Sequence, residues 1–183
     1  MTLYGFENAT IIYAGAAPGQ HTNYLSNLFP DMKFILIDPS PFQTKATERI
    51  DILHDTYFDD NLAQELKKKC DNNILFISDI RSFSNTTKEK NQKEDRCEID
   101  MENQKRWHLI LSPKASMLKL RFPYKPGITK YLEGDIFFPV WGPMTTTECR
   151  LIATSSIEKE YDHTDYEQMM FHFNTHFRTS YWV

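Results

Sequence analysis

The chain has 183 residues and a formal net charge of −4, from 21 basic and 25 acidic side chains. At roughly 150 residues per domain this length predicts a single domain over residues 1–183. A composition of 40% hydrophobic and 14% aromatic residues excludes a disordered or collagen-like chain. The acidic balance excludes a globally basic surface, so any RNA contact has to be local.

Short runs rich in Ile, Leu, Phe and Val predict seven strands, at residues 10–14, 33–38, 51–54, 74–79, 117–122, 135–140 and 149–154. Residues 34–37 and 74–77 are apolar at successive positions, which is typical of parallel strands covered on both faces. Apolar residues at helical spacing predict helices at 20–29, 59–70 and 164–179, the last of which should dock on the sheet. This alternation predicts an α/β fold with a central, mostly parallel seven-stranded sheet flanked by helices.

A charged segment at about residues 84–106 interrupts the pattern with six basic and six acidic side chains. Because it is neutral overall, it is not a basic arm for nucleic acid. We expect a mobile surface excursion at its start and a solvated helix at its end.

Three cysteines, Cys70, Cys97 and Cys149, lie far apart, which argues against a disulfide framework or zinc ribbon and indicates a reducing compartment. His172 and His176 lack a recognisable third ligand, so no metal site is predicted. There is no basic leader before an apolar stretch and no apolar run near ~20 residues, so we expect a soluble protein without a membrane contact.

The first candidate site is the turn after the first predicted strand. Gly15 and Gly19 allow unusual backbone angles and a close approach of ligand to backbone. Ala17 replaces the second glycine of the dinucleotide fingerprint, so a nucleoside without a pyrophosphate fits better. Asp38, 23 positions after Gly15, is placed to bind ribose hydroxyls. The alternative is a structural turn in which Asp38 is only a cap.

The second candidate site lies at strand ends. Asp79 closes one predicted strand, Glu148 opens another, and Lys119 sits within an apolar strand. Burying such a lysine disfavours its charged form, which would make it a usable base. The alternatives are a buried ion pair without catalytic role, or an edge strand with Lys119 in solvent.

Five motifs together resemble the poxvirus-type cap-specific mRNA 2′-O-methyltransferases, which are also regulatory subunits of the viral poly(A) polymerase. They are GAAPGQH at 15–21, ISDIRS at 77–82, LSPKASMLKLRFPY at 111–124, ECRL at 148–151 and DYEQMM at 165–170. The resemblance implies a Rossmann-like methyltransferase fold, S-adenosylmethionine as cofactor, and methylation of the first transcribed nucleotide of capped mRNA. It also implies a viral poly(A) polymerase catalytic subunit as partner, and a cytoplasmic location in the infected cell or in the virion.

The resemblance also implies roles for individual residues. Positions matching the cofactor site are Tyr13, Gly15, Gly19, Asp38, Ser40, Phe58 and Asp79. Asp79, Lys119 and Glu148 match three members of a catalytic Lys-Asp-Lys-Glu tetrad, with Lys119 as the base. Positions matching the cap site are Arg121, Phe122, Pro123, Tyr124 and Glu167, with Tyr124 as the ring that stacks on methylated guanine.

Two departures from the family pattern leave another function open. No lysine or arginine occurs in residues 1–14, where the first tetrad lysine would precede the glycine turn, and Pro126 stands where the family has an acidic cap contact. The alternative is an RNA-binding or polymerase-processivity subunit that keeps the fold without turnover. A nicotinamide-dependent enzyme is a weaker third reading, because Ala17 interrupts the phosphate fingerprint.

Overall fold

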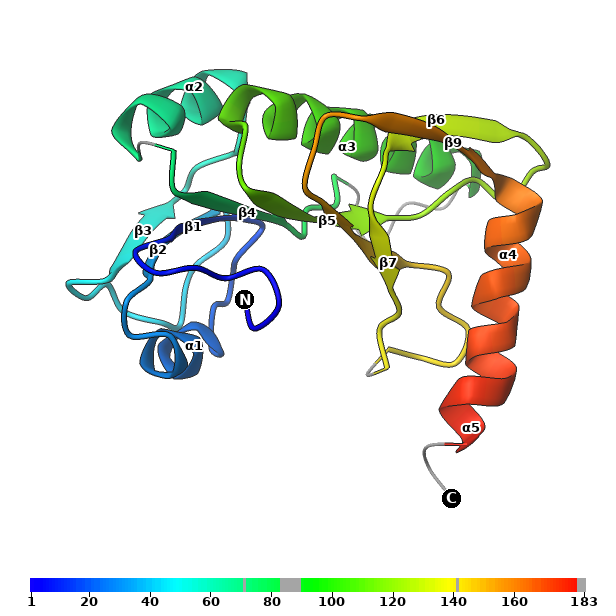
Figure 1. Ribbon diagram of the computed structural model, residues 1–183, viewed down its shortest axis with the longest axis horizontal. Coiled ribbons are helices and arrows are strands. Elements are labelled where there is room, and N and C mark those ends of the chain that lie inside the picture. Colours follow the sequence, from blue (N-terminus) through cyan, green and yellow to red (C-terminus); the bar gives the residue numbers. More distant parts are fainter. Residues whose placement is uncertain (71, 83–89, 141, 181–183) are drawn as a thin grey trace.

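The computed structural model describes residues 1–70, 72–82, 90–140 and 142–180. Its centre is a seven-stranded sheet in the order β3-β2-β1-β4-β5-β8-β7 (Figure 1). The strands are β1 (Thr10–Ala14), β2 (Lys33–Asp38), β3 (Ile50–His54), β4 (Ile74–Ser78), β5 (Ala115–Leu120), β7 (Asp135–Phe137) and β8 (Cys149–Ala153). The first five in spatial order are parallel, whereas β8 is antiparallel to both β5 and β7. The predicted mostly parallel seven-stranded sheet is confirmed.

Helices cover both faces of the sheet because the strands are apolar on both. One face carries α2 (Asp60–Lys69) and α3 (Lys90–Leu111), and the other carries α1 (Thr22–Leu28) (Figure 1). Within β1, Ile12 packs in the core beneath α2 and α3, while Ile11 packs in the core on the opposite face. This alternation follows from the two-residue period of a strand.

A two-stranded antiparallel ribbon, β6 (Ile128–Leu132) and β9 (Glu158–Asp162), was not predicted from the sequence. Its strands carry charged residues such as Lys130 and Glu160 on their outer face and therefore lack a continuous apolar run. The ribbon is anchored by Tyr131, which is fully buried and donates from its hydroxyl to the Met101 carbonyl at 2.9 Å.

The helix predicted at the end of the charged segment is present, but the prediction that it is solvated was wrong for one of its faces, which is buried. Residues 84–89 lie outside the described part of the chain, and α3 begins at Lys90. One face of α3 is buried against the sheet and includes apolar Cys97, Met101, Trp107 and Leu111, together with polar Asp100, Gln104 and His108. The polar members are buried because each has a hydrogen-bond partner on another element.

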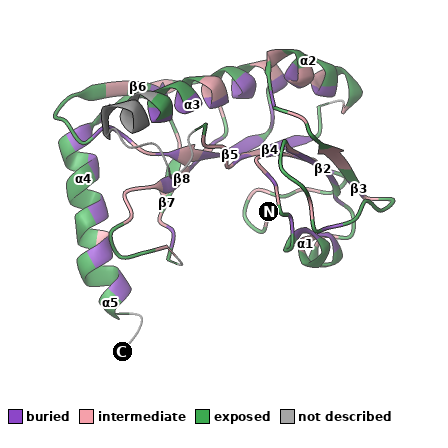
Figure 2. Ribbon diagram, turned by 180° about the vertical axis from the view of Figure 1, so that it is seen from behind, coloured by how far each residue is buried: buried purple, intermediate pink, exposed green. Residues whose placement is uncertain are grey.

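The C-terminal helical stretch consists of α4 (His163–His172), a π-helical turn η1 (Phe173–Phe177) and a final turn α5 (Arg178–Ser180). It stands along the β7 edge and docks only partly, since Tyr166 and Met170 are buried whereas Met169 and Phe177 remain exposed (Figure 2). In the described residues no helix has both the length and the apolar composition needed to cross a membrane. Cys97 and Cys149 are buried thiols that form no disulfide.

Candidate active site

Three predicted catalytic residues meet where the ends of β4, β5 and β8 come together. Asp79 directly follows β4, Lys119 lies near the carboxyl end of β5, and Glu148 directly precedes β8. Because β8 is antiparallel to β5, its start lies at the same edge of the sheet. The Lys119 Nζ is 2.9 Å from Oδ1 of Asp79 and 3.5 Å from Oε1 of Glu148. The alternative of an edge strand with Lys119 in solvent is excluded, since its side chain is only 14% exposed.

Two arginines that the sequence reasoning missed complete this network. Arg150 binds both carboxylates, Asp79 at 2.8 Å and Glu148 at 3.1 Å. Arg81 binds the other oxygen of Glu148 at 2.8 Å. Each arginine lies two residues after a predicted carboxylate, and this Asp-x-Arg and Glu-x-Arg spacing is the signal that could have identified them.

The charges in this five-residue network are unequal, with three cations against two carboxylates. Burial alone would raise the pKa of Glu148, but Arg81, then Lys119 and Arg150, outweigh it and bring the pKa below its usual value. Glu148 is therefore ionised at neutral pH. The excess cation supplies a local positive charge on a chain whose net charge is negative.

A cavity of about 510 Å³ adjoins the network at the carboxyl ends of β1, β2 and β4. Gly15, Asp38, Ser40, Phe58 and Asp79, all predicted for the cofactor site, contribute to its lining. Its volume lies within the range of small-molecule sites. The aromatic wall is extended by Trp107 of α3, whose ring centroid lies 4.9 Å from that of Phe58 and which the sequence reasoning did not assign to a site.

Asp38 has a structural role and spare binding capacity. Its two carboxylate oxygens accept from the main-chain N–H groups of Ala17, at 3.1 Å, and Ser40, at 2.8 Å. These bonds tie the glycine turn to the segment after β2, as the turn-cap alternative requires. A carboxylate has about four lone-pair positions, so it can also accept from ribose hydroxyls in the cavity.

Both glycines are required by the backbone, and Gly15 also lines the cavity. Gly15 has φ +78°, and a Cβ there would lie 2.9 Å from the Asp79 carbonyl carbon. The space beside Gly15 is thus filled by the chain leaving β4. Gly19, with φ +70°, faces the Phe42 ring and does not line the cavity.

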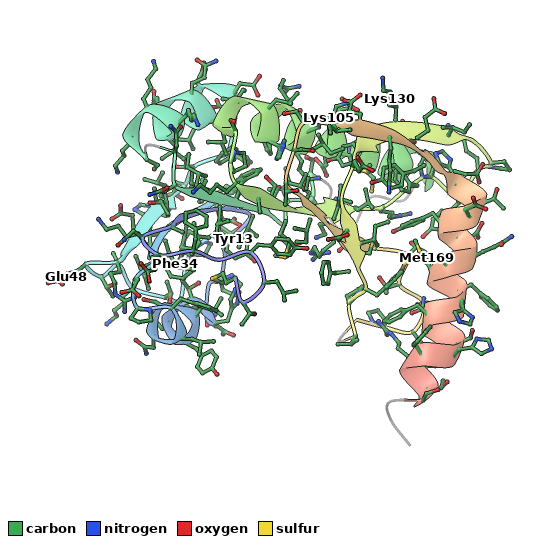
Figure 3. All side chains as sticks on the ribbon, in the orientation of Figure 1. Tyr13, Phe34, Glu48, Lys105, Lys130 and Met169 are labelled. Atoms are coloured by element: carbon green, nitrogen blue, oxygen red, sulfur yellow. The ribbon has the colours of Figure 1, made fainter. Side chains whose placement is uncertain are left out.

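Tyr13 also lies outside the cavity lining. It sits on the side of the sheet away from α2 and α3 (Figure 3). Burial, followed by the nearby Asp79 carboxylate, raises the pKa of Tyr13 to about 12. Its phenol is therefore neutral at physiological pH beside the charged network.

The predicted cap segment follows β5 and divides into exposed and buried residues. Tyr124 is 40% exposed, its hydroxyl is 2.8 Å from that of Thr147, and the Arg121 guanidinium lies 4.6 Å from its ring centroid. Phe122, by contrast, is 3% exposed and packs on His163 of α4. A direct contact between Phe122 and a cap stays a prediction, and the largely buried ring borders a second cavity together with Pro123.

The other two predicted cap residues also differ in exposure. Pro123 is buried beside Phe122, whereas Glu167 is exposed on α4. The neighbouring Tyr166 donates its hydroxyl to the Thr147 carbonyl at 2.7 Å, which brings the start of α4 next to the residue that Tyr124 contacts. Glu167 therefore lies on a helix that contacts the same residue, Thr147, as the exposed Tyr124.

The two histidines that lie four residues apart in the sequence fall on the C-terminal helical stretch. His172 and His176 stack with ring centroids 4.6 Å apart. Within the described ranges, no group of three or more His, Cys, Asp or Glu residues could hold a metal ion.

The sheet order, the cavity at the strand ends and Asp38 at the end of β2 define a Rossmann-like methyltransferase fold. The solved structure of bluetongue virus VP4, described as a multifunctional RNA-capping production line, matches with a TM-score of 0.61 at 14% identity. This match covers 91% of this chain and 29% of VP4.

The sequence model of the family described as "Poly A polymerase regulatory subunit" matches residues 3–182, and the chain belongs to that family. It is 31% identical to the fowlpox virus cap-specific mRNA (nucleoside-2′-O-)-methyltransferase, over 93% of this chain and 60% of the relative. It is 28% identical to the protein of the same name from myxoma virus (strain Lausanne), over 92% of this chain and 54% of the relative. The chain thus spans somewhat more than half the length of these relatives.

Proposed function

We propose that this chain carries a cap-specific mRNA 2′-O-methyltransferase site, which transfers a methyl group from S-adenosylmethionine to the ribose 2′-hydroxyl of the first transcribed nucleotide. The observation that carries the proposal is the meeting of Asp79, Lys119 and Glu148 beside a nucleoside-sized cavity. The relatives' printed names and the fold support the same chemistry.

The cavity residues fit S-adenosylmethionine. Asp38 has acceptor positions left for ribose hydroxyls, and Phe58 with Trp107 offers an apolar wall for an adenine. Asp79 borders both the cavity and the charged network, so it joins the cofactor site to the reaction site. When bound, this cofactor supplies an electrophilic methyl group.

The chain's own residues would orient and deprotonate the acceptor. Asp79 and Glu148 would fix the position of the Lys119 Nζ, which as a neutral amine would accept a hydrogen bond from the ribose hydroxyl and take its proton. Arg81 and Arg150 share those carboxylates and so hold them in place beside Lys119. Arginine does not lose its proton at physiological pH, which leaves Lys119 as the cation in this network able to exchange one.

Recognition of the RNA would use the exposed part of the segment after β5. Tyr124 offers a ring for stacking on the positively charged methylated guanine, and Glu167 offers an acid for its edge. Arg121 and the excess cation of the network would attract the RNA backbone. An infected-cell cytoplasmic or virion location belongs to the same proposal.

A second candidate function is RNA holding by a regulatory subunit of a viral poly(A) polymerase, with its catalytic subunit as partner. The family description favours it. Such a protein would bind RNA through the same surface without needing turnover.

Calorimetric titration with S-adenosylmethionine, followed by methyl transfer to capped and uncapped RNA, tests the proposal. We expect the wild-type chain to bind the cofactor and to methylate capped RNA only. Asp38→Ala should weaken binding, and Lys119→Met should abolish transfer while leaving binding intact. Transfer by Lys119→Met at the wild-type rate would refute the assigned base, and binding without transfer would favour the regulatory function.

A further inference from the structure

Three buried polar residues of α3 form a stripe at helical spacing, Asp100, Gln104 and His108. Each is at most 3% exposed and faces the sheet, where apolar side chains are the norm. Residues four apart lie on one face of a helix, so the stripe runs along the side of α3 that faces the sheet, from the end of β4 to the start of β5. Burying these groups costs free energy unless each makes specific hydrogen bonds.

Gln104 makes both of its bonds to the main chain of Lys119. Its Oε1 accepts from the Lys119 N–H at 3.0 Å, and its Nε2 donates to the Lys119 carbonyl at 3.1 Å. Leu118 of β5 and Ser78 of β4 are the last paired residues of these two strands, so Lys119 is the first residue of β5 beyond that pairing. A side-chain amide has the same donor and acceptor as a peptide group, and here it takes the place of the next residue of a neighbouring strand.

Asp100, one helical turn earlier, fixes the segment that leaves β4. Its Oδ2 accepts from the Ser82 N–H at 3.0 Å, and its Oδ1 accepts from the Ser82 hydroxyl. Asp79 and Arg81 lie just before Ser82 in this segment. Through Asp100 and Gln104, α3 therefore holds two of the three strand ends whose side chains form the charged network, those of β4 and β5.

We propose that Gln104 is a positioning residue that sets the Lys119 amine against Asp79 and Glu148 by extending the β5 ladder beyond the end of β4. The inference rests on the proposed function, in which Lys119 handles the ribose proton. Displacements of about 1 Å at a reacting group can cost on the order of a hundredfold in rate, so a strand end that is not held in place would lower the rate of methyl transfer.

His108 provides a matched control on the same helix. It is also buried and also makes two hydrogen bonds, at 2.7 Å to the Ser116 hydroxyl and at 3.1 Å to the Ser155 carbonyl. Ser116 lies at the opposite end of β5 from the network. Gln104→Met and His108→Met thus remove comparable bonds from one helix, near the site and away from it.

The test measures three quantities on wild type and both variants: the melting temperature, the hydrogen exchange rate of the Lys119 amide, and the kinetics of methyl transfer. We expect both variants to melt at lower temperature. Only in Gln104→Met should the Lys119 amide exchange about tenfold or more faster than the loss of stability of that variant explains. Only this variant should also lose about tenfold or more in kcat, while its KM for S-adenosylmethionine stays within about twofold of wild type. If Gln104→Met does not fold, Gln104→Asn, one methylene too short to make both bonds, takes its place.

Unchanged Lys119 amide exchange, or an equal fall of kcat in the two variants, would overturn the positioning role. If wild type transfers no methyl groups, the proposed function fails. The positioning role of Gln104 is then tested without methyl transfer, by the exchange rate of the Lys119 amide and by the 13Cε chemical shift of the Lys119 side chain. A changed Lys119 shift confined to Gln104→Met would support the role, and an unchanged shift would refute it.

Discussion

Lys119 and Arg150 occupy paired positions on the antiparallel strands β5 and β8, and both bind the same oxygen, Oδ1 of Asp79, at 2.9 and 2.8 Å. Like charges directly opposite each other on a sheet repel. They are stable side by side here because two carboxylates lie between them. The pair places a second cation beside Lys119 from within the sheet, in a chain with no Lys or Arg in residues 1–14.

We predict that Arg150→Met lowers methyl transfer by about tenfold or more, because Asp79 and Glu148 lose the group that binds both of them. Arg150→Lys should recover little, since one ammonium lacks the planar fork that spans two carboxylates. Single-turnover transfer, with cofactor affinity measured alongside, gives the comparison. Wild-type rates in Arg150→Met would show that the arginine is structurally and catalytically dispensable.

Gly15→Ala should destabilise the fold by about 1–3 kcal/mol. The cause is twofold, since Gly15 has φ +78° and an added Cβ would lie 2.9 Å from the Asp79 main chain. Gly142→Ala is the control, because its nearest neighbour to an added Cβ is the Arg178 guanidinium at 3.5 Å. Urea unfolding of the two variants measures the difference, and equal free energies of unfolding would contradict the steric account.

Glu148→Gln should make stability less dependent on acid pH. The folded protein lowers the pKa of Glu148, so its ion pairs stabilise the fold above the unfolded value near ~4.3 and are lost as pH falls through the lower folded value. Free energies of unfolding from pH 7 to 3 should therefore fall more steeply in wild type than in the variant. The exposed Glu65→Gln serves as control, and a wild-type slope in Glu148→Gln would refute the linkage.

The sequence by itself determined the central sheet. The strands at 10–14 and 33–38 were predicted with their observed bounds, because continuous apolar runs are stable only as strands covered on both faces. A helix was predicted from residue 59, and in the structure Asp59 caps α2 by accepting from the Leu62 N–H at 2.8 Å. The meeting of Asp79, Lys119 and Glu148 followed from strand ends that share one edge of the sheet.

Only the tertiary structure decided which polar and aromatic residues are buried. Arg81 and Gln104 look like ordinary surface residues in the sequence, and their partners lie on other strands and helices. Phe122 sits in a motif that suggests ligand contact, and its largely buried ring packs on His163 of α4. Hydrophobic runs are local and can be read along a chain, whereas hydrogen bonds and ion pairs between distant segments exist only once packing has brought those segments together.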